Sequence, residues 1–197
     1  MALALDSAAQ DLLFRQAQTA NTFTDEPVTD EQMQAVYDLV KFGPTAFNQS
    51  PLRVTLVRSE DARKRLVKHA AGSNADKTLS APLTAVLSFD VDFHERLPEL
   101  FPAAPGIKDT FFAELPAREA AGAQNATLQA GYFIVGVRAA GLAAGPMTGF
   151  DFDGINAEFF EDGKQRAFMV VNIGKPGEDA FRPRAPRLSF DDAVTTV

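Results

Sequence analysis

The stretch from Gly141 to Asp151 reads GLAAGPMTGFD and directly follows a long apolar segment. Its small side chains leave the backbone bare, Pro146 fixes one φ angle, and Gly149 is free to adopt positive φ. Such a stretch can bring its own N–H groups against a flat ligand. An ordinary exit from a helix into a loop explains the same residues equally well, so the neighbouring segments decide its meaning.

The composition is that of a globular protein with few reactive side chains. The chain has 197 residues, of which 46% are hydrophobic and 23% charged, and its net charge of −7 argues against binding to nucleic acid. No apolar run approaches the ~20 residues of a membrane span, which predicts a cytoplasmic protein. There is no cysteine, and the two histidines, His69 and His94, lack metal-ligand spacing, so we expect no metal site. Difficult chemistry would then fall to a cofactor.

Upstream of the opening stretch, the pattern predicts helices with recognisable ends. Thr29-Asp30-Glu31-Gln32 has the form of a capping box, apolar residues then recur at helical spacing, and Gly43-Pro44 ends the helix. The segment from Ala120 to Ala140 is apolar on nearly every side, which indicates a buried helix that a second copy of the protein could cover. Shorter helices are expected after Asp6, after Ser59, at 93–100 and at 155–160.

Three segments have the pattern of strands. Residues 52–58 alternate between apolar and polar side chains, while residues 83–89 and 167–173 are almost continuously apolar. Strands separated by helices predict an α+β (mixed α/β) fold, a central sheet flanked by helices in a single domain over 1–197. From about 175 to 197, prolines among arginines predict an extended C-terminal arm.

Four short motifs follow one another in a fixed order. They are QTANTF at 18–23, GPTAFNQSP at 43–51, GSNADK at 72–77 and GPMTGFD at 145–151. Together they resemble the FMN-dependent nitroreductase family. In the same order, that family's segments bind the phosphate, cover the isoalloxazine ring, contact the ring and the ribityl chain, and face flavin N5. Each motif alone is weakly specific, whereas their order and spacing are strong. The resemblance extends over about residues 10–194.

Three further runs resemble one subgroup of that family, the malonic semialdehyde reductases of pyrimidine degradation. They are YDLVKFGPT at 37–45, LPELFP at 97–102 and PRAPRL at 183–188.

The resemblance implies a set of cofactor-binding residues and no catalytic acid or base, because the flavin itself carries the hydride. Lys77 would tune the flavin, since a cation near N1 favours the anionic reduced ring. Asn74 offers a donor and an acceptor to the pyrimidine edge. A surface lysine and a loop asparagine are the plain alternatives. The full implied set is Gln18, Thr19, Asn21, Pro44, Thr45, Ala46, Asn48, Asn74, Lys77, Pro146, Met147, Thr148, Gly149, Arg184 and Arg187.

The phosphate-binding positions depart from the family pattern. The usual N-terminal arginine appears as Gln18 or Ala17, and a later basic position appears as Asn21. Arg15 lies one helical turn earlier and could compensate. Arg184 and Arg187 match the C-terminal basic positions, so the phosphate charge is assigned to them. A solubilising tail is the other interpretation of these two arginines.

The resemblance implies an FMN-dependent homodimer that takes electrons from NADH or NADPH and reduces a small molecule in a ping-pong cycle. The subgroup implies reduction of malonic semialdehyde to 3-hydroxypropionate. A broad nitroaromatic or quinone reductase is the alternative within this class. A non-catalytic flavin-binding protein and a hydrolase-like domain without flavin are the alternatives outside it, although the sequence contains neither a G-x-S-x-G elbow nor a G-x-G-x-x-G turn.

Overall fold

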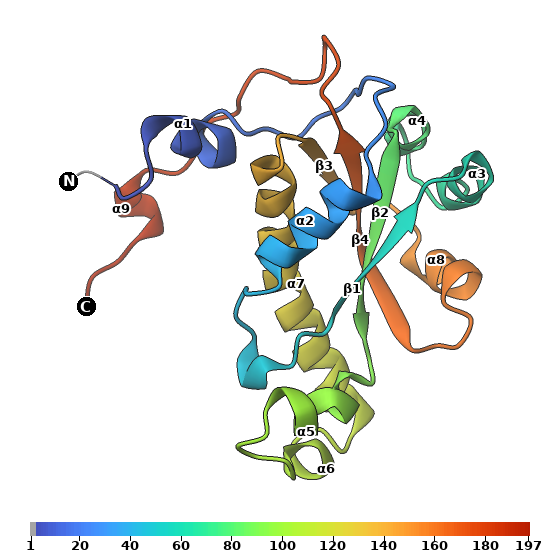
Figure 1. Cartoon of the computed structure of the whole chain (residues 1–197), viewed down its shortest axis with the longest axis vertical. Helices are drawn as coiled ribbons and strands as arrows, with labels where there is room; N and C mark the ends of the chain where they lie inside the picture. Colours follow the sequence, from blue (N-terminus) through green and yellow to red (C-terminus); the bar gives the residue numbers. More distant parts are fainter. Residues whose placement is uncertain (1–2) are drawn as a thin grey trace.

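The structure is a computed structural model that describes residues 3–197, and it is built around one antiparallel sheet. The strands are β1 (Leu52–Val57), β2 (Leu83–Asp90), β3 (Ala143–Met147) and β4 (Gln165–Gly174), arranged in the order β1-β2-β4-β3. All three strand pairs are antiparallel. The expected sheet flanked by helices is therefore confirmed, and Figure 1 shows its layers.

The helices cover both faces of the sheet. One face packs against α2 (Asp30–Val40) and α7 (Leu115–Ala139), and this side holds the larger hydrophobic core. The other face carries α3 (Glu60–Val67), α4 (Asn74–Ser80) and α8 (Phe152–Phe159) around a second core. The remaining elements are short: α1 (Ser7–Gln10), a π-turn at Asp11–Arg15, 3₁₀ turns η2 (Ala46–Asn48) and η3 (Phe93–Arg96), α5 (Leu97–Leu100), α6 (Ile107–Thr110) and α9 (Phe190–Ala193).

Side-chain caps set the helix ends that the sequence predicted. Thr29 and Gln32 form the reciprocal capping box that starts α2. Ser59 caps α3 through the N–H of Ala62, and Asp151 caps α8 through the N–H of Gly154. Just after the C-terminal end of α7, Gly141 adopts a φ of +72°, and the Leu142 N–H donates to the Val137 carbonyl at 3.2 Å. This left-handed glycine turns the chain directly into the GLAAGPM segment.

The structure corrects the interpretation of that segment as a loop, because Ala143–Met147 is the edge strand β3. Its alanines, glycine and proline obscured the strand pattern, yet β4 supplies the pairing, with Pro146 opposite Val171. An edge position tolerates a proline, since its missing N–H breaks no inner ladder. The turn predicted at this site begins only after Met147.

The central helix also differs from expectation in extent and in orientation. It starts at Leu115 rather than near Ala120. Its buried face carries Phe133 and Val137, with Gly136 between α7 and α2, whereas Leu128 and Tyr132 are exposed on the protomer. One chain therefore buries only part of this helix, and the cover that a second copy would provide stays a prediction.

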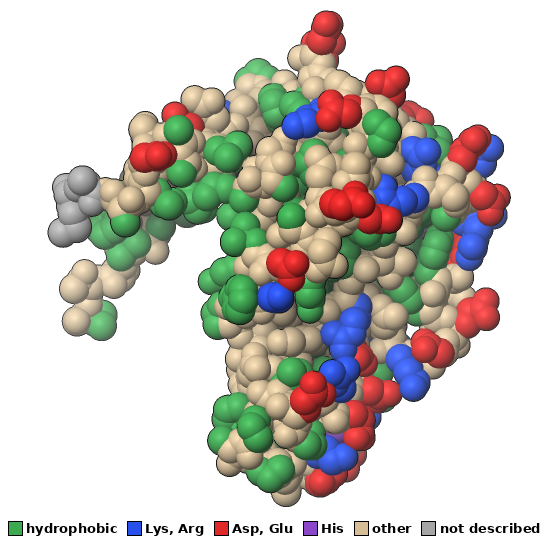
Figure 2. All heavy atoms as spheres, viewed as in Figure 1, with side chains coloured by type: hydrophobic (Ala, Val, Ile, Leu, Met, Phe, Trp, Pro, Cys, Tyr) green, Lys and Arg blue, Asp and Glu red, His purple; other side chains and the backbone are tan. Residues whose placement is uncertain are grey.

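The chain beyond Ala180 leaves the body as an arm, as expected, and α9 is the one helix of this segment. Figure 2 shows the arm standing away from the body, with a notch between them. Within residues 3–197, no helix is both long and apolar enough to cross a membrane. The same residues contain no group of three or more His, Asp or Glu side chains that could hold a metal ion.

Candidate functional site

The turn after β3 presents backbone donors that the protein leaves unused. The carbonyl of Gly149 accepts bonds from the Ala71 N–H and from Asn74 Nδ2, both at 3.0 Å. The N–H groups of Thr148 and Gly149 have no acceptor in the described part of the chain. A Cβ at Gly149 would lie 2.6 Å from Asn74 Nδ2, so only glycine allows the amide of Asn74 to reach this backbone.

Lys77 follows Asn74 by one turn of α4 and is partly buried. Its ammonium group forms no ion pair or hydrogen bond with any of residues 3–197. The helix beneath it is fixed, because the buried Thr78 hydroxyl contacts Asn172 Nδ2 at 3.4 Å, and Asn172 in turn accepts from Thr84 at 2.8 Å. The structure thus brings Asn74, Lys77 and the Thr148–Gly149 turn into one neighbourhood.

An ion-pair cluster of Glu158, Arg65 and His69 stabilises the chain next to the Thr148–Gly149 turn. Glu158 on α8 accepts from Arg65 Nε at 2.7 Å and lies 2.6 Å from His69 Nε2. Arg65 first, and His69 second, hold the pKa of the Glu158 carboxyl below its ordinary value. The His69 carbonyl accepts the Asp151 N–H at 2.8 Å, which fixes the residue that caps α8.

The N-terminal segment and the root of the arm lie against each other. The Ala20 N–H donates to the Ala144 carbonyl at 3.1 Å, and the Asn21 N–H donates to Ala180 at 2.9 Å. Arg184 donates to the carbonyl of Ala17 at 2.8 Å. The predicted residues Gln18, Thr19, Asn21 and Arg184 are therefore brought together.

Two other residues considered for the phosphate make different contacts. Among residues 3–197, Arg187 hydrogen-bonds only to the carbonyls of its neighbours Ala185 and Pro186. Arg15 pairs with Asp11 at 2.7 Å and bonds to Ser7, and its compensation for Gln18 stays a prediction.

Residues 43–51, the loop that the resemblance places over the isoalloxazine ring (here the ring loop), include a backbone conformation that few residues adopt. Phe47 and Asn48 have φ values of +54° and +51°. Thr45 Oγ1 accepts the Ser50 N–H at 3.1 Å, and Asn48 Nδ2 donates to Leu100 at 2.9 Å. Left-handed conformation at a bulky residue is uncommon and persists only where surrounding contacts hold it. The ring of Phe47 packs near three other rings, with centroid distances of 5.7 Å to Phe101, 6.0 Å to Phe111 and 6.1 Å to Phe112.

This loop lies far from the turn within one protomer. Figure 1 places η2 beside α5 near one end of α7, while α4 and the start of β3 lie toward the other end. Pro44, Thr45, Ala46 and Asn48 are therefore not assembled with Asn74 and Gly149 by a single chain. Pro146 and Met147 lie in β3 and lead into the Thr148–Gly149 turn.

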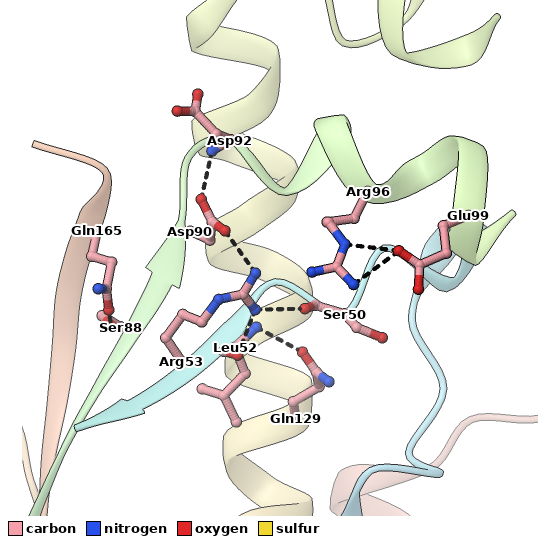
Figure 3. A network of polar contacts seen from close by, with 10 residues as sticks. All are labelled: Ser50, Leu52, Arg53, Ser88, Asp90, Asp92, Arg96, Glu99, Gln129 and Gln165. Atoms are coloured by element: carbon pink, nitrogen blue, oxygen red, sulfur yellow. Dashed lines mark hydrogen bonds and ion pairs between the residues drawn. The ribbon is translucent and has the colours of Figure 1, made fainter. Parts of the chain in front are cut away.

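Two buried amides on α7 hold the ring loop, and the sequence analysis missed them. Asn125 Oδ1 accepts the Ala46 N–H at 2.8 Å. Gln129 Oε1 accepts the Leu52 N–H at 3.0 Å, as Figure 3 shows. Polar residues four apart inside an apolar helix were the available signal, because buried amides need partners. They lie beside a groove of about 1080 Å³ between α2, β1 and α5, which Gln129 helps to line.

Arginines at the rim of this groove form their own network. Arg53 donates to Asp90 at 2.6 Å and to the Ser50 carbonyl at 3.1 Å, while Arg96 pairs with Glu99 at 2.9 Å. Figure 3 shows the two guanidinium groups on either side of Ser50. Both arginines line the groove, whereas Asp90 and Glu99 do not.

Comparisons with known proteins agree on one family. The model of the family described as "Nitroreductase family" matches residues 15–175. A Streptomyces coelicolor protein is 68% identical over the full length of both chains, and a Caulobacter protein is 44% identical over 98% of each; both are provisionally named NADH dehydrogenase/NAD(P)H nitroreductase. A nitroreductase-like structure from Exiguobacterium sibiricum, solved with FMN, superposes with a TM-score of 0.85 at 18% identity, over 100% of this chain and 99% of that one.

The fold is a four-stranded antiparallel sheet covered by helices, and a glycine turn whose backbone amides have no acceptor within residues 3–197 follows its edge strand β3. The chain belongs to the nitroreductase family. The family resemblance and the expectation of an enzyme are confirmed at this level.

Proposed function

We propose that this protein is an FMN-dependent NAD(P)H oxidoreductase, and that the Thr148–Gly149 turn faces the reacting edge of the flavin. The observation that carries the proposal is the pair of unused N–H donors beside Asn74 and the unpaired Lys77. These groups fit FMN, since a flavin offers an acceptor at N5 and a polar pyrimidine edge that develops negative charge on reduction.

The chain's own residues would position and polarise the cofactor. FMN, when bound there, would supply the chemistry of hydride transfer between the nicotinamide and a second substrate. Gly149 keeps the amide of Asn74 close to the turn, and Asn74 Oδ1 remains free to accept a hydrogen bond. Lys77 places a positive charge where the reduced ring is negative. Water can supply the proton that completes the reduced product, so no side chain needs to act as an acid.

A second copy of the chain completes the site in this proposal. The ring loop around Thr45 and Asn48 lies away from Asn74 in one protomer, and a homodimer would bring the two together across its interface. Large hydrophobic side chains are exposed on α2 and the residues just after it, and on α7 and the arm: Tyr37, Leu39, Phe42, Leu128, Tyr132, Leu188 and Phe190. So many large apolar side chains exposed on neighbouring elements favour an association face.

We further propose that the acceptor is a 3-oxoacid such as malonic semialdehyde, reduced to 3-hydroxypropionate with one hydride from NAD(P)H and one proton from water. The runs that resemble the malonic semialdehyde reductases support this choice. Arg53 and Arg96 on the rim of the groove add two guanidinium groups with spare donors for a carboxylate.

A broad nitroaromatic or quinone reductase is the second candidate, and one observation favours it. Phe47 and the partly or fully exposed Phe101 and Phe111 form an aromatic cluster at the ring loop. Rings at this position would stack on a flat acceptor.

Spectroscopy tests the proposed cofactor and activity. The purified protein should carry flavin absorbance, and NADH or NADPH should bleach it under nitrogen. A colourless protein that binds no added FMN would favour the hydrolase-like alternative. A flavin that stays oxidised with both donors would favour a non-catalytic flavin-binding protein.

Acceptor assays then separate the two candidate substrates. With saturating NAD(P)H, kcat/KM is measured for malonic semialdehyde, a nitroaromatic and a quinone. We expect Arg53→Met and Arg96→Met to lower kcat/KM for the oxoacid alone. A wild-type enzyme that is efficient only with the nitroaromatic or the quinone would contradict the oxoacid proposal.

A further inference from the structure

A small cavity of about 210 Å³ opens where the end of α7 meets the N-terminal segment. Gln18 and Ala17 line one side, and Arg138, Leu142 and Phe181 contribute from α7, the start of the GLAAGPM segment and the root of the arm. Gln18 is the position at which the sequence analysis found an arginine replaced.

Arg138 is an unpartnered cation in this cavity. Its Nε atom is buried without a hydrogen-bond acceptor, and the guanidinium forms no ion pair with any residue from 3 to 197. Burial lowers the pKa of Arg138, and the neighbouring positive charge of Arg184 lowers it further. The negative end of a helix favours a cation in the last turn, but it does not explain a donor held away from both water and acceptors.

The other charged groups around the cavity leave it with an excess of positive charge. Arg184 contacts the Ala17 carbonyl at 2.8 Å, and Lys175 contacts the Gly141 carbonyl at 3.1 Å, so both cations lie against lining residues. Asp11 is the one carboxylate in the lining, and it already pairs with Arg15 at 2.7 Å. Two guanidinium groups without a free carboxylate call for an anion from outside the protein.

We propose that Arg138 binds a phosphate group in this cavity, that of FMN, and so takes over the role of the arginine that Gln18 replaces. This inference rests on the proposed function. Phosphate suits the site because its oxygens can accept from the Arg138 guanidinium and from Arg184 at once. The same charge chemistry could bind a phosphate of the nicotinamide dinucleotide, which the experiment distinguishes.

The main experiment compares FMN with riboflavin, which has the same ring and no phosphate. Apoprotein is titrated with each ligand for the wild type, Arg138→Met and Arg138→Lys. We expect Arg138→Met to weaken FMN binding about ten- to a hundredfold, to leave riboflavin binding unchanged, and to be partly rescued in Arg138→Lys. Lys64→Met on the surface of α3 removes the same charge and serves as the control.

Two further arms use other readouts. Inorganic phosphate should raise the Tm of the wild-type apoprotein and not that of Arg138→Met. Gln18→Arg in the Arg138→Met background should restore the preference for FMN, because it returns a cation to the same cavity.

Each outcome has one meaning. Equal weakening of FMN and riboflavin would show a structural role for Arg138 and overturn the inference, as would no change in either. Unchanged FMN binding with a raised KM for NADPH relative to NADH would assign the cavity to the dinucleotide and also overturn it. If the wild type binds neither flavin, the proposed function itself fails.

Discussion

In the described part of the chain, three side chains are notable for groups that are absent around them: a Cβ beside Asn74, and carboxylate partners beside Lys77 and Arg138. Asn74 reaches the backbone of Gly149 only because no Cβ is present there. Lys77 and Arg138 are cations that no carboxylate in the described chain neutralises, one beside the turn and the other beside Gln18. Of the two, Arg138 carries the stronger signal, because folded proteins rarely leave a buried polar atom without a hydrogen-bond partner.

At this scale, Lys77→Met should shift the flavin toward the oxidised state. A cation about 4 Å away at an effective dielectric near 20 interacts with about 4 kcal/mol. If about a quarter of that survives solvent screening, the two-electron midpoint potential of the variant moves negative by roughly 20 mV. A redox titration against a reference dye measures it, with Lys64→Met as the charge control. A variant that keeps its flavin and its midpoint potential would falsify the role assigned to Lys77.

Sequence motifs selected candidate site residues, but they did not reveal what surrounds them. Asn74, Lys77 and Gly149 could be named from motifs, because local spacing carries them. Asn125 and Gln129 could not be paired with Ala46 and Leu52 from sequence, since those contacts join segments far apart in the chain. Arg138 was missed because a last-turn arginine looks like an ordinary helix cap until its burial is known.

Elements meet at two tight contacts that decide how the sheet is covered. Gly136 on α7 lets α2 approach, because a Cβ there would lie 2.2 Å from Val40 Cγ1. On the other face, Glu158 ties α8 to Arg65 and His69 near the end of α3. The capping box and periodicity predicted α2 and α3 well, whereas α7 and α8 start earlier in the chain than expected. β3 was missed because its strand character comes from its partner β4 rather than from its own residues.

Gly136→Ala should lower the free energy of unfolding. Overpacking costs about 1–3 kcal/mol, which outweighs the gain in helix propensity, at most about 1 kcal/mol. Val40→Ala in the same chain should recover much of the loss, since it removes the methyl groups that the new Cβ would meet. Urea unfolding of both variants checks the idea, and an unchanged single variant would contradict it.

Glu158→Gln should make stability less dependent on pH. Because the folded-state pKa of Glu158 is depressed, its ion pairs stabilise the wild type above the unfolded pKa, and that contribution is lost as the pH falls through the folded value. The wild type should therefore be more stable than the variant at pH 7, and the difference should shrink in the acid range below the ordinary glutamate pKa. Tm curves that stay parallel from neutral to acid pH would rule this out.

At the scale of the whole molecule, one chain leaves apolar surface uncovered on one side of its sheet. The exposed apolar residues of α2 and α7, the groove beside β1 and the projecting arm all lie on one side of the sheet (Figures 1 and 2). The sequence pointed to this through a helix that looked too apolar for a small protein. It could not indicate which face remained uncovered, because that depends on how α7 is rotated against the sheet.

Association should therefore be obligatory for cofactor binding. Light scattering at micromolar concentration should give twice the 21.3 kDa of one chain. Leu128→Asp with Tyr132→Asp places charges on the exposed face of α7 and should yield monomers that release FMN. A matched change on α3, Lys64→Asp, should alter neither property. Monomers that remain folded and loaded with flavin would contradict the shared site.

The two edges of the sheet are unequal, and this limits how far chains can polymerise. The outer edge of β3 is occupied by the Ala20 segment and interrupted by Pro146, whereas the edge strand β1 contains neither proline nor glycine and pairs only with β2. Fibres need two adhesive edges on every molecule, one to receive a strand and one to offer it. With a single adhesive edge, edge-to-edge contact ends at a closed pair, so a partly unfolded population should accumulate as dimers rather than grow into filaments.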